Sequence, residues 1–109
     1  MYKDYFEKRT GGVYFENEYG FITFHYLNET TMFIEDVYIK PEFRQQGHGF
    51  QLVKHVENIA KETNRNKVMT TVDLSLPLSR DVGVLSSFGI GMKISHVSGS
   101  FLYFIKDIT

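Results

Sequence analysis

One stretch of the chain limits its fold more than any other, because a strand there leads through a glycine-containing loop directly into a helix. Residues 32–40 form an alternating apolar strand, which Pro41 ends because proline cannot donate a hydrogen bond to a sheet. Apolar side chains then recur at helical spacing over residues 50–63. Between the two lies the polar loop Arg44-Gln45-Gln46-Gly47-His48-Gly49. The sequence therefore predicts a strand–loop–helix unit near its middle.

Such a loop places the first turn of a helix where an anion can bind. The first N–H groups of a helix have no partner within the helix, and they carry the positive end of its dipole. Diphosphates bind at such positions, and a glycine lets a phosphate approach the backbone because it has no Cβ. Tight turns that bind nothing show the same pattern, so Gly47-x-Gly49 alone leaves both interpretations open.

The rest of the chain predicts further strands and one more helix. The second helix begins near Ser79, after Pro77 has ended the strand before it, and residues 1–10 support no assignment. The resulting order is strand, strand, strand, helix, strand, helix, strand, strand, which we interpret as a single α/β (α+β) domain over residues 1–109. The predicted strands besides 32–40 are 13–17, 21–27, 68–76, 92–97 and 101–108.

Composition excludes several classes of protein. The net charge is −1 and basic residues are scattered, so we expect no nucleic-acid partner. Cysteine is absent and the four histidines lack ligand spacing, so we expect no disulfide and no metal site. No apolar run approaches the roughly 18 residues of a membrane span, and the N-terminal segment is too charged for a signal peptide. We expect a cytoplasmic protein.

The wider context of the loop, FIEDVYIKPEFRQQGHG, carries a resemblance to a known family. It resembles the acetyl-CoA signature of the GNAT superfamily of N-acetyltransferases, Arg/Gln-x-x-Gly-x-Gly/Ala, with its preceding strand and following helix. The resemblance is specific over residues 34–52 and weaker over the rest of 12–108. It implies a mixed, mostly antiparallel central sheet flanked by helices.

The resemblance also implies acetyl-CoA as co-substrate. In the family a bulge splays two strands, and the pantetheine arm lies between them as an added strand. The backbone of Val37, Tyr38 and Ile39 would then bind pantetheine, and the backbone of the loop would hold the pyrophosphate, with Arg44 adding charge. For the His48 side chain we expect exposure and no role of its own. The implied cofactor-binding residues are Val37, Tyr38, Ile39, Arg44, Gln45, Gln46, Gly47, His48 and Gly49.

Glu35 is the candidate general base. An ammonium ion cannot attack a thioester, so a group that removes its proton assists acetyl transfer. Many members of the family carry an acid two residues before the pantetheine-binding segment, and Glu35 matches that position. On a regular strand Asp36 faces the other way, so it is the weaker candidate. The alternative is that Glu35 only pairs with a neighbouring Lys or Arg.

The chain departs from the family pattern in two respects. The tyrosine that serves as general acid in many members has no counterpart, because Leu85 or Ser87 stands in its place. Only about ten residues precede Gly11, where typical members have a strand and two helices. The acceptor site would then be open or completed by a second subunit, so we expect a homodimer.

Three functions remain open from the sequence. The first is an N-acetyltransferase that moves an acetyl group from acetyl-CoA to a primary amine on an unknown acceptor. The second is a non-catalytic module of the same fold that binds acyl-CoA or a protein. The third is a small mixed-sheet interaction protein whose loop resembles the motif by chance.

Overall fold

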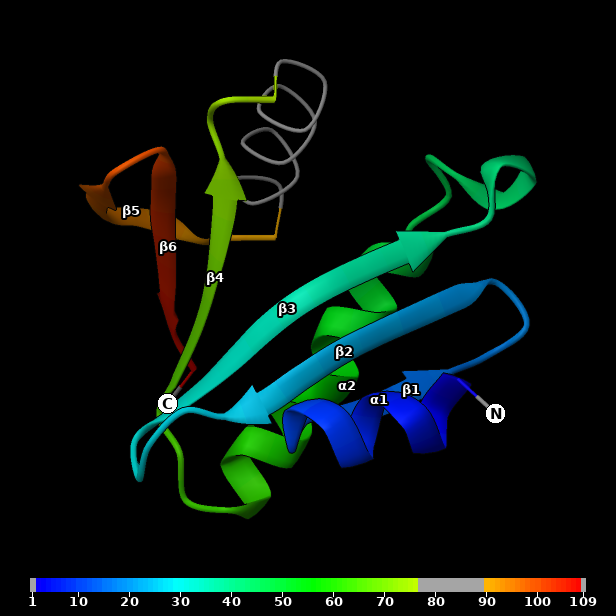
Figure 1. The fold of residues 1–109 in the computed structure, drawn as a ribbon, viewed down its shortest axis with the longest axis horizontal. Coiled ribbons are helices and arrows are strands. Elements are labelled where there is room, and N and C mark those ends of the chain that lie inside the picture. The colour runs from blue at the N-terminus through cyan, green and yellow to red at the C-terminus, as the bar shows by residue number, and fades with distance from the viewer. Residues whose placement is uncertain (1, 77–89, 109) are drawn as a thin grey trace.

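The computed structural model describes residues 2–76 and 90–108. Six strands in this part of the chain form one sheet of order β1-β2-β3-β4-β6-β5. Figure 1 shows α2 crossing behind β2 and β3, and α1 lying in front of β1. The elements are α1 (Tyr2–Thr10), β1 (Val13–Glu16), β2 (Gly20–Tyr26), β3 (Thr31–Ile39), the 3-10 turn η1 (Pro41–Phe43), α2 (His48–Glu62), β4 (Lys67–Asp73), β5 (Lys93–Ser98) and β6 (Phe101–Asp107).

The predicted mixed, mostly antiparallel sheet is confirmed. Neighbouring strands run antiparallel throughout the described residues except for β3 and β4, which are parallel. The strand predicted over 68–76 is shorter than expected, since β4 ends at Asp73 and the next residues form a turn. The predicted helix near Ser79 lies outside the described residues. One nine-residue helix, α1, occupies the segment that the sequence left unassigned.

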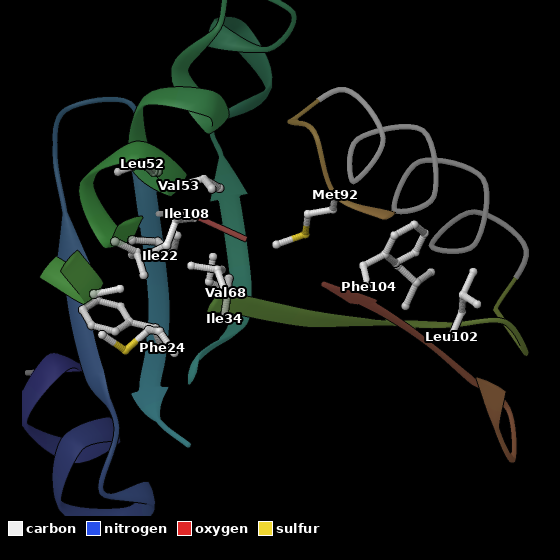
Figure 2. Close-up of a cluster of buried hydrophobic side chains, with 14 residues drawn as sticks. Ile22, Phe24, Ile34, Leu52, Val53, Val68, Met92, Leu102, Phe104 and Ile108 are labelled. Atoms are coloured by element: carbon white, nitrogen blue, oxygen red, sulfur yellow. The ribbon is translucent and has the colours of Figure 1, made fainter. Parts of the chain in front are cut away.

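The core lies between α2 and the sheet. The apolar side of α2 buries Leu52, Val53 and Val56 against the central strands, as Figure 2 shows for Leu52 and Val53 beside Ile22 and Ile34. Burying each such side chain contributes about 1.5–3 kcal/mol to the free energy of unfolding. This explains why α2 forms here despite a glycine in its first turn. The helix therefore fixes the loop before it relative to β2 and β3.

A buried ion pair ties the same helix to the other half of the sheet. Glu57 of α2 is only 2% exposed, and its carboxylate accepts a hydrogen bond of 2.9 Å from Lys106 Nζ on β6. Lys54 lies 3.6 Å from the other carboxylate oxygen. A buried carboxylate is costly unless it is paired, so this contact specifies how α2 sits across the sheet.

A bulge in β3 changes which side chains share a face. Thr23 pairs with Asp36 and Phe24 pairs with Ile34, so Glu35 is an extra residue without a directly opposite partner on β2. The side-chain alternation is therefore reset at Glu35. The sequence predicted a regular alternating strand over residues 32–40, and this prediction was wrong at Glu35, where one extra residue interrupts the alternation.

The corrected faces follow from the register. Ile22 and Phe24 lie on the α2 face, and their partners Val37 and Ile34 share that face. Asp36 and Tyr38 lie on the opposite face, which also carries the Tyr2–Tyr14 and Phe21–Tyr38 ring contacts. The face of the sheet that lies away from α2 is therefore rich in aromatic rings.

Strands β3 and β4 separate just at the bulge. They pair only over residues 31–34 and 67–70, and the Thr70 hydroxyl donates to the Ile34 carbonyl at 2.9 Å at the last paired row. Beyond this row β3 continues along β2 while β4 continues along β6, and the two strands diverge (Figure 1). The C-terminal half of β3 is thus paired on one side only within the described residues.

We predict that Gly20→Ala destabilises the fold by about 2–3 kcal/mol, as expected for overpacking. A Cβ at Gly20 would collide with the Tyr38 carbonyl oxygen and lie 2.9 Å from the Ile39 Cα, and both are backbone atoms that cannot move aside. Urea unfolding measures the effect. Gly99→Ala is the control, because its Cβ meets nothing within 4 Å and only its positive φ of 59° is unfavourable, costing about 1 kcal/mol. An equal or smaller loss for Gly20→Ala would contradict the prediction.

Candidate functional site

Beyond Ile34, β3 pairs with no strand of the described residues on its β4 side, and this edge carries free backbone groups. Past the bulge, the Lys40 N–H donates to the Tyr19 carbonyl on the β2 side, so the alternation of the strand directs the N–H and C=O groups of Val37 and Ile39 toward β4. The Tyr38 carbonyl faces the other way, against Gly20 of β2. Of the three strand residues predicted to bind pantetheine through their backbone, Val37 and Ile39 have the required direction.

The loop after β3 brings the start of α2 close to this edge. Gln45 and Gly47 adopt left-handed backbone conformations, with φ of 63° and 86°, and Gly47 is the N-cap of α2. Glycine suits this position because other residues rarely take such a φ. The first helical bond runs from Gln51 N–H to the Gly47 carbonyl at 3.2 Å.

The N–H groups before Gln51 are free within the described part of the chain. None of residues 45–50 donates its N–H to another protein group there, as expected for the first turn of a helix. Gln45, Gln46 and Gly47 are exposed, and His48 and Gly49 are half-buried. The loop thus offers a cluster of unpaired donors at the positive end of the α2 dipole.

Arg44 links the loop to the end of β3. Its Nε donates to the Ile39 carbonyl at 2.9 Å, and its guanidinium lies 5.5 Å from the centre of the Tyr38 ring. Among the described residues Arg44 forms no ion pair with a carboxylate. Its positive charge therefore remains available beside the free N–H groups.

The His48 side chain has a packing role that the sequence did not predict. Its ring stacks on Tyr19 with 3.6 Å between centroids, and Phe43 meets both rings edge-on. The Lys40 N–H also donates to the Tyr19 carbonyl at 2.8 Å. The neighbouring Glu18 carboxylate raises the pKa of Tyr19, so its phenol is neutral at pH 7. This aromatic cluster holds the loop against the β1–β2 turn.

Glu35 has a partner that was not among the alternatives considered from the sequence. Its Oε1 lies 3.0 Å from His25 Nδ1 on β2, and the two side chains are 36% and 31% exposed. The His25 ring in turn stacks on Phe33, with centroids 5.1 Å apart. The partner is thus a histidine rather than a lysine or arginine. The turn at residues 27–30 could have indicated this contact from the sequence. A hairpin closed by that turn places His25 opposite Phe33, and Glu35 follows Phe33 by two residues on the same strand.

The site residues therefore form two groups along β3. Glu35 lies at the bulge, where the strands separate, whereas Arg44 and the loop lie beyond the end of the strand, with Val37 and Ile39 between them. Leu85 and Ser87, at the position of the family's general acid, lie outside the described residues.

The described part of the chain contains neither a metal-binding cluster nor a membrane-spanning helix. In residues 2–76 and 90–108, no three His, Asp or Glu side chains are grouped so that they could hold a metal ion. The helices of these same residues include none with the length and apolar character of a membrane span.

The family of the chain follows from its sequence. Residues 3–82 match the sequence model of the Acetyltransferase (GNAT) family. This match includes β3, the loop and α2, and it spans well over half of the chain. The chain therefore belongs to the GNAT family. This excludes the alternative that its loop resembles the family motif by chance. No curated protein sequence matches the chain.

Solved structures share the fold. A GNAT-family protein from Desulfovibrio desulfuricans has a TM-score of 0.78 at 10% identity, covering 97% of this chain and 76% of its own. A family acetyltransferase from Elizabethkingia anophelis with acetyl-CoA bound has a TM-score of 0.72 at 17% identity, covering 96% and 82%. The PaiA N-acetyltransferase of Thermoplasma acidophilum, in complex with coenzyme A, has a TM-score of 0.71 at 22% identity, covering 82% of this chain. The chain spans only 53% of that last protein.

We predict an energetic coupling between Tyr19 and His48. In a double-mutant cycle of Tyr19→Leu and His48→Ala, the coupling free energy should be about 0.5–1.5 kcal/mol, because each variant removes the same stacked pair. Urea unfolding of the four proteins gives this value. The control cycle combines Tyr19→Leu with His96→Ala at the other edge of the sheet, where the effects should add. Additivity in both cycles would contradict the contribution of the Tyr19–His48 stack to stability.

Proposed function

We propose that the chain binds acetyl-CoA where β3 and β4 diverge and transfers its acetyl group to a primary amine. One observation carries the proposal, and it concerns the described residues of a GNAT fold. The N–H groups at the start of α2 lie at the end of β3, and neither they nor that edge of β3 has a partner among these residues. The relatives from Thermoplasma and Elizabethkingia were solved with coenzyme A and acetyl-CoA, which supports the choice of ligand.

The loop is suited to the pyrophosphate. Its free N–H groups are hydrogen-bond donors, and the α2 dipole favours a negative charge at the same point. Arg44 contributes a full positive charge without a competing carboxylate in the described residues. A Cβ at Gly47 would meet none of the described residues within 4 Å. Gln45, Gln46, Gly47, His48 and Gly49 would thus bind the pyrophosphate through their backbone.

The edge of β3 is suited to the pantetheine arm. Val37 and Ile39 direct their backbone N–H and C=O groups away from β2, where an extended chain with amide groups can pair with them as an added strand. Thr70 already occupies the Ile34 carbonyl at 2.9 Å, so this pairing would start beyond the last β3–β4 row. The thioester would then lie near the bulge. Tyr38, which we also predicted from the sequence, would contribute its ring and its contact with Arg44 rather than its carbonyl.

The catalytic contribution would be chiefly the placement of the two reactants, with Glu35 assisting deprotonation of the amine. Its carboxylate is near the bulge and partly exposed, so it can meet an incoming ammonium ion. The amine nitrogen attacks the thioester carbon, and coenzyme A leaves as a thiolate.

A second candidate function is a non-catalytic acyl-CoA-binding module or protein-interaction module of the same fold. The observation that favours it is the contact of Glu35 with His25, which engages one carboxylate oxygen on the β2 side. If the Glu35 carboxylate had only this structural role, the protein would bind acyl-CoA but would not transfer the acyl group. Amine-dependent turnover distinguishes the two functions.

A homodimer and a cytoplasmic location are part of the same proposal. An open acceptor site could be completed by a second copy of the chain. Light scattering on the purified protein reports the oligomeric state, and a monomer would count against the dimer.

We predict that the protein binds acetyl-CoA with micromolar affinity and that Gly49→Asp weakens this binding at least about tenfold, which is about 1.4 kcal/mol. Gly49 is the second residue of α2. An aspartate in a first turn usually stabilises a helix, so a loss of binding cannot be attributed to unfolding. Calorimetric titration measures the affinity.

Gly49→Ala is the matched control. Its Cβ would lie 3.8 Å from the nearest Ile39 side-chain atom, an ordinary contact, and it adds no charge. This variant should bind acetyl-CoA nearly as well as the wild type. Equal affinities for Gly49→Asp and the wild type, or no binding by folded wild-type protein, would contradict a pyrophosphate site at this loop.

We predict that the protein releases coenzyme A from acetyl-CoA in an amine-dependent manner. The measurement is thiol release with a panel that contains spermidine, an aminoglycoside and a peptide with a free N-terminus. Gly49→Asp should lose this activity at acetyl-CoA concentrations that saturate the wild type. Binding without release across the panel would favour the non-catalytic function.

A further inference from the structure

The contact between His25 and Glu35 is more specific than an ordinary surface ion pair. Nδ1 of the imidazole is 3.0 Å from the carboxylate, and stacking on Phe33 fixes the plane of the ring. Two contacts of different kinds thus determine the orientation of one half-buried histidine. A long, flexible side chain on a surface would not be held in this way.

The location of the pair relates it to the proposed reaction centre. His25 lies in the row His25–Phe33–Met69, which crosses β2, β3 and β4 immediately before the last row that joins β3 to β4. Neighbouring strands are about 4.8 Å apart, so His25 is about one strand from the point of divergence. It lies on the face opposite α2, since it alternates with Phe24.

We propose that His25 is the proton acceptor for the amine and that Glu35 is its positioning residue. The inference rests on the proposed acetyl transfer and replaces Glu35 by His25 as the group that touches the acceptor. In a neutral imidazole, Nδ1–H donates to Glu35, and Nε2 then carries the lone pair. Nε2 is on the far side of the ring from the carboxylate, so Glu35 leaves it free.

The chemistry of the two groups favours this division. An imidazole changes its charge near neutral pH, so it can accept a proton there and release it again to solvent. The Glu35 carboxylate stabilises the imidazolium that forms and keeps Nδ1 protonated before the reaction. In the reverse role, a proton taken up by the Glu35 carboxylate would remove its charge and weaken the hydrogen bond that it accepts from His25.

The proton and electron balance of the step is simple. Nε2 of His25 takes one proton from the ammonium ion, which leaves a neutral amine with a lone pair. That lone pair forms the C–N bond to the thioester carbon, and the C–S bond breaks with its electrons on sulfur. The nitrogen then loses a second proton. One of the two protons ends on the coenzyme A sulfur and the other in solvent.

The surroundings of His25 fit a cationic acceptor. Asp36 is exposed on the same face, directly opposite Thr23. Its exposed carboxylate can attract the ammonium group of an acceptor toward the face that carries His25.

The first test measures turnover with the most active amine of the spermidine, aminoglycoside and peptide panel. His25→Ala should lower kcat about 100-fold without changing the affinity for acetyl-CoA. Imidazole in the buffer should restore part of the rate, which a purely structural role would not allow. Glu35→Gln should lower kcat about tenfold. The double variant of His25→Ala and Glu35→Gln should be no slower than His25→Ala alone. His96→Ala, another stacked histidine, should keep the wild-type rate.

A weakly basic acceptor separates proton removal from other effects. Hydroxylamine is largely uncharged at neutral pH, so its reaction needs no initial deprotonation. Its rate should fall far less in His25→Ala than the rate of spermidine. Equal losses for both amines, or no rescue by imidazole, would overturn the role of His25.

The second test is independent of activity and separates the failure of the inference from that of the proposed function. Nitrogen NMR of the imidazole at alkaline pH, where a histidine ring is neutral, should show His25 as the Nδ1–H tautomer, and Glu35→Gln should weaken this preference. An Nε2–H tautomer in the wild type would overturn the inference even if acetyl transfer occurs. Absence of turnover in the wild type, with the expected tautomer, would overturn the acetyl transfer and with it the catalytic role of His25.

Discussion

The extra residue in β3 is the constraint on which the rest of the site depends. Up to Ile34 the strand pairs on both sides, and a hydrogen bond from Thr70 closes the last row with β4. At Glu35 the alternation is reset, and β3 follows β2 alone. A regular strand in this position would continue its pairing with β4 and would leave no backbone edge for a ligand. The bulge therefore creates the edge that we propose for pantetheine binding, and it places Glu35 at the beginning of that edge.

The two ends of this edge are held by different means. At the far end, the Tyr19–His48 stack and the Arg44 contact with the Ile39 carbonyl hold the loop in place. At the near end, the contact of Glu35 with His25 fixes a charged side chain where the strands separate. Since α2 packs on one face only, its core contacts hold the loop without covering the face that carries His25. The proposed binding and chemistry thus rely on separate contacts.

Much of the fold could be predicted from the chain because its signals are local. The alternation over residues 32–40, the stop at Pro41, the glycine loop and the helical spacing after it gave β3 and α2 with small errors at their ends. The β4 strand was overextended because Leu74 and Leu76 continue its alternation in a turn. Helix α1 was missed since its sequence has mixed charge and no clear apolar face.

The sequence by itself determined the family, the glycine pattern of Gly47 and Gly49 that motivates the proposed pyrophosphate site, and Glu35 as a residue of interest. These depend on residue type and spacing along the chain, which are visible without a structure. Only the tertiary structure decided which way β3 faces after the bulge, and that His25 rather than a lysine or arginine meets Glu35. The bulge is defined by the register between two strands, and the contact joins side chains ten residues apart. Both arise from pairing between segments, so no local pattern specifies them.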